Sequence, residues 1–92
     1  ATSDTDRTID FATSNLAYTT ADCGAFTLQN MIDGGSYTLA VKGATAATCS
    51  FTAAGFTIHL PTDHGATTVS THTLYTFLVM GADIYVSWIP GL

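Results

Sequence analysis

The C-terminal end of the chain is the feature that most limits its fold. Residues 71–92 read THTLYTFLVMGADIYVSWIPGL and contain one charged residue, Asp83. A helix that spans a membrane needs about 20 consecutive apolar residues without turn signals. Here Gly81 and Asp83 interrupt the run with residue types common in turns, and both halves are rich in the β-branched and aromatic residues that favour strands. The segment therefore predicts a β-hairpin with arms 73–80 and 83–89, and no insertion into a membrane.

Both faces of this predicted hairpin carry apolar side chains. Because side chains alternate along a strand, Tyr75, Phe77 and Val79 share one face, whereas Leu78 and Met80 lie on the other. The second arm divides in the same way, into Ile84, Val86 and Trp88 on one face and Tyr85, Ser87 and Ile89 on the other. One face can cover the core of the domain, and the other needs a second cover. In a chain with only 10% charged residues, oligomerisation is the economical cover, and a compact monomer with an apolar surface is the alternative.

The rest of the chain reads as short strands separated by turns. The alternation is cleanest at 36–42, where Tyr37, Leu39 and Val41 share one face. Further strands are expected at 8–11, 16–20, 25–29, around Phe51 and over 56–60, with a long loop at 61–72. No segment carries a helical period of 3.6 residues with capping signals. The pattern predicts an all-β fold, a small sandwich or barrel.

Composition excludes several classes of partner. The formal net charge is −5, and Arg7 and Lys42 are the only basic residues among 92. Two cations cannot form a stripe that follows a phosphate backbone, so nucleic acid is not expected as a partner, nor is an anionic membrane surface. The 18 threonines and the absence of Glu are typical of extracellular all-β assemblies. The first residues, ATSDTDR, are polar and acidic and do not resemble a signal peptide.

Four segments together resemble a known family: TIDFATSN, FTLQNMIDGGSYTLAVKG, FTIHLP and HTLYTFLVMGADIYVSWIPGL. This order is similar to that of the C-terminal tip domain of phage tail fibres and of related trimeric adhesive fibres of bacteria, including predatory bacteria. The matching elements are an Ile-Asp pair at 9–10, a Leu-x-Asn segment at 28–30, the strand GSYTLAV at 35–41 and the aromatic hairpin at 73–89. Many such domains carry a Trp-Pro segment in the middle strands, which CSFTAAGFTIHLP replaces here.

The resemblance implies a β-sandwich protomer, a parallel homotrimer and a place at the distal end of an extracellular fibre, on a virion tail or on a bacterial cell surface. Residues 1–7 would lead in from the fibre stem, and 8–92 would form a single tip domain. The expected function is adhesive: the tip would recognise a glycan or another ligand, such as a protein, on the surface of a host or prey cell. The alternative is a purely structural domain that holds three chains in register and caps the fibre without binding a ligand.

Catalysis is not expected. No nucleophile elbow, P-loop or dinucleotide motif occurs, and the spacing of His59, His64 and His72 matches no metal signature. A glycosidase would need two carboxylates at roughly 5–10 Å from each other, and the seven Asp residues lie mostly in the first third of the chain and in turns. We therefore predict no catalytic residue, no metal and no cofactor. One exception stays open: on a three-fold axis a single His would supply three ligands to an ion.

The expected ligand site is the loop 61–72 with nearby aromatic residues. A saccharide offers hydroxyls and an apolar C–H face, so polar loop groups beside an aromatic ring suit it, and loops at one end of a β scaffold commonly carry binding residues. The candidate ligand-binding residues are Asp63, His64, His72, Tyr85 and Trp88; for Trp88 the alternative is a place in the core. Cys23 and Cys49 can form a disulfide, which would stabilise by roughly 3–4 kcal/mol, or can be two buried free thiols.

Overall fold

The computed structural model describes residues 1–4 and 6–92 and contains strands but no helix in that part of the chain. The nine strands described are β1 (Thr2–Asp4), β2 (Thr8–Asp10), β3 (Leu16–Thr19), β4 (Ala25–Gln29), β5 (Ser36–Val41), β6 (Ser50–Thr52), β7 (Thr57–His59), β8 (Thr73–Met80) and β9 (Asp83–Ile89). They form a six-stranded sheet in the order β1-β3-β5-β8-β9-β7 and a three-stranded sheet in the order β2-β4-β6. The predicted all-β class is confirmed.

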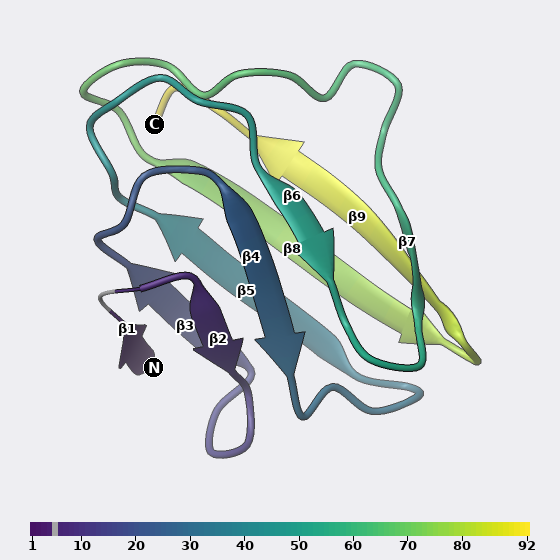
Figure 1. Ribbon diagram of the computed structural model, residues 1–92. Helices are drawn as coiled ribbons and strands as arrows, with labels where there is room; N and C mark the ends of the chain where they lie inside the picture. The colour runs from purple at the N-terminus through teal and green to yellow at the C-terminus, as the bar shows by residue number, and fades with distance from the viewer. Residues whose placement is uncertain (5) are drawn as a thin grey trace.

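The chain winds between the two sheets as in a solenoid. Strands β1, β3 and β5 are parallel neighbours in the large sheet, and β2, β4 and β6 are parallel neighbours in the small one. Successive strands up to β6 therefore alternate between the layers, and Figure 1 shows the small sheet lying across the large one. Parallel neighbours require a crossover between them, and in this chain the strand of the opposite layer supplies that crossover.

The C-terminal hairpin completes the large sheet. Strand β8 pairs antiparallel with both β5 and β9, and β7 adds parallel to β9 at the edge (Figure 1). The hairpin turns at Gly81 and Ala82, between the paired residues Met80 and Asp83. Gly81 has φ +65°, and glycine at the first central position of a two-residue hairpin loop adopts such a φ at no steric cost.

One hydrophobic core lies between the layers. From β8 it receives Tyr75 and Phe77, both with no exposed surface. The ring of Phe51 from β6 reaches across the layers and contacts these two rings edge-on, at centroid distances of 4.8 and 5.1 Å. The side chains of Tyr37, Leu39 and Val41 are buried. The faces predicted for β5 and for the inner side of the hairpin are therefore confirmed.

The strand predictions hold with small shifts at the ends. Both hairpin arms have the predicted bounds, and no helix in the described part of the chain is long and apolar enough to cross a membrane. Within residues 1–7, predicted as a lead from a fibre stem, Thr2–Asp4 form β1 and pair with β3. No pattern in the sequence indicates this strand. A segment can be an edge strand and also continue from a stem, so the boundary at residue 8 stays a prediction.

Candidate functional site

The first candidate site is a polar and aromatic cluster beneath the loop 61–72. Its loop begins with a turn in which the N–H of His64 donates to the carbonyl of Pro61 at 3.1 Å. This turn places the His64 imidazole Nε2 at 2.9 Å from the hydroxyl of Tyr75 and its ring edge-on to Trp88, with centroids 4.8 Å apart. Trp88 also stacks on Tyr75 at 6.2 Å. The cluster therefore joins the loop to the paired strands β8 and β9.

Burial sets the protonation of this cluster. Loss of water around His64 lowers the pKa of its imidazole, and the nearby Asp63 carboxylate opposes this shift only in part. Burial also raises the pKa of Tyr75 to about 12, so its hydroxyl keeps its proton at neutral pH. The hydrogen bond thus joins a protonated phenol to an imidazole that favours its neutral form. This arrangement fixes the ring of His64.

The five predicted ligand residues occupy three places. Asp63 and His64 lie together in the loop, with Asp63 exposed, and Trp88 is partly buried against the core beneath them. His72 lies at the start of β8, where its main chain exchanges two hydrogen bonds with Leu92, at 2.8 and 3.0 Å. Tyr85 lies on β9 and points away from the small sheet. The structure therefore brings Asp63, His64 and Trp88 into one neighbourhood and places the other two elsewhere.

A second polar cluster lies at the edge of the large sheet. The Nε2 atom of His59 on β7 is 2.8 Å from a carboxylate oxygen of Asp83, and the His59 ring stacks on Tyr85 with centroids 5.2 Å apart. Both members of the ion pair are about half exposed. The sequence did not predict this contact because His59 and Asp83 are 24 positions apart and meet only through the parallel pairing of β7 with β9.

The hairpin exposes an apolar outer face, the face of β8 and β9 that points away from the small sheet. Its members are Leu74, Thr76, Leu78, Met80, Asp83, Tyr85, Ser87 and Ile89. Large side chains there are open to solvent in the single chain: Leu78 is 39% exposed, Met80 57%, Tyr85 46% and Ile89 54%. Among the residues of this face, Tyr85 and Asp83 carry ionisable side chains, and the Asp83 carboxylate is 2.8 Å from His59 Nε2. Exposed apolar patches of this kind mark interfaces.

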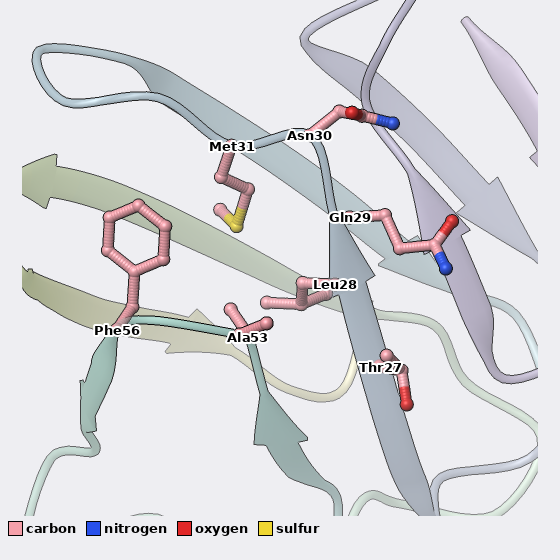
Figure 2. Close-up of a pocket in the computed structure, with 8 residues that line it drawn as sticks. Thr27, Leu28, Gln29, Asn30, Met31, Ala53 and Phe56 are labelled. Carbon is pink, nitrogen blue, oxygen red and sulfur yellow. The ribbon is translucent and has the colours of Figure 1, made fainter.

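A groove of about 360 Å³ opens on the other side of the molecule, beside β4. It lies between the end of β4 and residues 53–56, which follow β6. Figure 2 shows the side chains of Leu28, Met31, Ala53 and Phe56 in this space, while those of Gln29 and Asn30 point away from it. No residue of the groove was predicted as a site residue. Its walls come from segments more than 20 positions apart, and each reads separately as ordinary core sequence.

Cys23 and Cys49 form a disulfide, with their Cα atoms 4.6 Å apart. They precede the neighbouring strands β4 and β6, which pair from Ala25 and Ser50 onward. Within residues 1–4 and 6–92, no three His, Cys, Asp or Glu side chains gather where a metal ion could be held. Comparisons of the chain with protein-family models, with curated proteins and with solved structures gave no match.

Proposed function

We propose that this protein is the distal adhesive tip of a trimeric extracellular fibre and that it binds a glycan or a protein on the surface of a host or prey cell. The observation that carries the proposal is the outer face of the hairpin. Its apolar side chains stand in solvent although the inner face of the same two strands is fully packed. Apolar surface left in water is unfavourable in free energy, and a large exposed apolar patch usually marks an interface.

A further copy of the chain is the cover that fits this face. The carboxylate of Asp83 on the outer face already has a hydrogen-bonding partner within the protomer, His59 at 2.8 Å, so a second copy does not meet a carboxylate without a partner. A ring of three chains is closed by heterologous contacts, in which one surface patch of each chain meets a different patch of the next chain. The number three and the place at a fibre tip are supported by the resemblance of the sequence to trimeric fibre tips.

Adhesion would depend on the loop 61–72. It exposes Thr62, Asp63 and Thr68, groups that donate and accept hydrogen bonds, above the partly buried Trp88. Bridges to the neighbouring segment hold the loop in place: Thr67 N–H donates to the carbonyl of Ala47 at 2.9 Å. Three weak sites on one trimer would raise the avidity well above the affinity of a single site.

The alternative, a structural cap that binds no ligand, is favoured by one observation. His64 and Trp88, two of the predicted ligand residues, are engaged inside the protomer by Tyr75. Such contacts stabilise the protomer and occupy groups that a ligand would otherwise contact. The cap and the adhesin share the same trimer and differ in the surface of the loop.

Binding of the isolated fluorescent domain to whole bacterial cells and to a glycan array separates the two functions. The adhesin is expected to bind, and the double variant Asp63→Ala with His64→Ala to lose most binding while keeping its oligomeric state. Asn15→Ala, which removes an exposed polar side chain from another loop, is the control. A parent domain that binds neither cells nor glycans would leave the structural cap as the function.

A further inference from the structure

We propose that the groove between β4 and residues 53–56 binds one ring of a neutral saccharide. This inference rests on the proposed adhesive function and places a ligand site on a different surface from the loop 61–72. The groove arises where two strands separate. Strand β4 continues through Gln29, but its last pair with β6 is Thr27 with Thr52.

The separation is caused by a turn. Residues 53–56 fold back on themselves, because the N–H of Phe56 donates to the carbonyl of Ala53 at 3.0 Å. Gly55 has φ +85° in this turn, a backbone conformation that glycine adopts readily and other residues avoid. After the turn the chain crosses to β7 in the large sheet. The small sheet therefore loses its third strand while β4 is still extended.

The end of β4 is left with main-chain groups that have no partner. On its β2 side, the carbonyl of Gln29 accepts from the N–H of Phe11 at 3.1 Å. Because successive residues of a strand direct these groups to opposite sides, the carbonyl of Leu28 and the N–H of Asn30 point toward the groove. In the described chain no hydrogen bond from the turn reaches them. The groove thus offers one acceptor and one donor close together.

An apolar floor lies beside these two groups. Leu28, Met31 and Ala53 are buried to more than 90%, and the ring of Phe56 is half-buried at the opposite wall (Figure 2). None of the eight residues that line the groove is ionisable. A charged ligand would lose hydration there without gaining a partner. A pyranose ring matches the site, since its C–H face can lie on Phe56 while two neighbouring hydroxyls donate to Leu28 and accept from Asn30.

Two further observations favour a saccharide over an extended peptide. A peptide that adds to a strand edge forms main-chain pairs over several residues. Here the free edge is short, because Asn30 has φ +60° and ends the extended conformation. The Asn30 side chain is held in this position by its Nδ2, which donates to Asp10 at 2.6 Å. The groove volume of about 360 Å³ is near the lower limit for small-ligand sites, which suits one sugar ring.

The test is a backbone amide NMR titration of the ¹⁵N-labelled chain with glucose, galactose, mannose and N-acetylglucosamine, and separately with a capped tetra-alanine peptide. We expect at least one sugar to shift the amides of Asn30 and Ala54 at millimolar concentration. Ala54→Trp, which adds a ring at the mouth of the groove, should weaken this binding at least about tenfold. Ala46→Trp, an equal change beside the loop 61–72, should leave it unchanged. Thermal unfolding checks that both variants fold.

Three results would overturn the inference: no shift with any of the sugars, shifts confined to residues 61–72, or groove shifts with the peptide alone. Each concerns the parent chain and does not depend on a variant that folds. The proposed function is judged separately by adhesion of the parent domain to cells. If the domain adheres to cells but sugars cause no amide shifts in the groove, the saccharide site alone is rejected. If the domain does not adhere, the adhesive function is rejected.

Discussion

His64 is a titratable residue whose protonated form is disfavoured in the folded protein. Burial lowers its imidazole pKa below the ordinary value of 6.5. Protonation therefore favours the unfolded chain. The contribution of His64 to stability is complete above pH 6.5, and it declines as the pH falls through 6.5 toward the lowered pKa.

We expect the free energy of unfolding to fall between pH 7.5 and pH 5, and the variant His64→Gln to show a weaker fall because its amide does not titrate. Urea unfolding at several pH values measures both. His72→Gln, a change of an exposed histidine in the same loop, should retain the slope of the parent. An unchanged slope in His64→Gln would show that its burial is not the cause.

Gly43 is required by close packing rather than by its backbone angles. A Cβ atom at this buried position would overlap the Cα atom of Asp22 and the carbonyl oxygen of Ala21, both main-chain atoms that cannot rotate away. Asp22 is itself fixed, because its carboxylate accepts from the N–H of Thr45 at 3.1 Å.

Gly43→Ala should therefore lower the free energy of unfolding by about 1–3 kcal/mol, the usual cost of overpacking. Gly65→Ala is the matched control, since a Cβ atom there meets nothing within 4 Å. The midpoint of urea unfolding measures both variants. Equal midpoints for the two would contradict the overlap.

At the scale of elements, the disulfide joins the beginnings of two neighbouring parallel strands. The small sheet has three short strands. The bond between Cys23 and Cys49 fixes β4 beside β6 where these strands begin, whereas the groove lies where β4 ends. The disulfide closes a loop with a sequence separation of 26, so the chain-entropy model predicts a stabilisation of roughly 3–4 kcal/mol.

We expect no free thiol when the non-reduced protein is denatured, and a loss of roughly 3–4 kcal/mol in the variant Cys23→Ala with Cys49→Ala. Thiol titration and urea unfolding are the measurements. Reducing agent should have the same effect on the parent and none on the variant. Two titratable thiols per chain would exclude the bond.

The whole molecule has one fully packed core and one uncovered apolar face. The core is held by the inner face of the hairpin and is complete within a single chain, so the protomer needs no partner to bury it. The outer face is the surface that we propose a further copy of the chain covers. Because the two faces belong to the same strands, assembly and stability can be separated by substitutions on the outer face alone.

We predict that the parent is a trimer in size-exclusion chromatography with light scattering, and that Leu78→Thr with Met80→Thr is a folded monomer. Threonine retains strand preference, while each large apolar side chain removed from an interface costs about 1.5–3 kcal/mol. Val69→Thr, which changes an exposed residue of the loop 61–72 rather than of β8 or β9, should remain trimeric. A parent that is monomeric at micromolar concentration would contradict the proposal.

Local structure could be predicted from the sequence alone. Alternation placed Tyr37, Leu39 and Val41 inside, and the interruption at Gly81 placed the hairpin turn, because strand periodicity and turn chemistry act over a few residues. The short β1 was missed, since three residues are too few to show a period. The sequence also indicated that Asp63 and His64 would lie together, as neighbours in one loop must.

Which strands are neighbours follows from the packing of the whole chain. Parallel strands are joined by crossovers rather than by tight turns, so the pattern along one strand does not show which distant strand pairs with it. Parallel pairing of β7 with β9 brought His59 to Asp83, the fold of the loop 61–72 over β8 placed His64 against Tyr75, and the turn at residues 53–56 led the chain away from β4 and opened the groove. Trp88 shows the same limit: its sequence suits either a binding surface or a core, and packing against Tyr75 made it partly buried. Sites built by such contacts depend on the energy of the whole fold, and the sequence shows them only once the strands are paired.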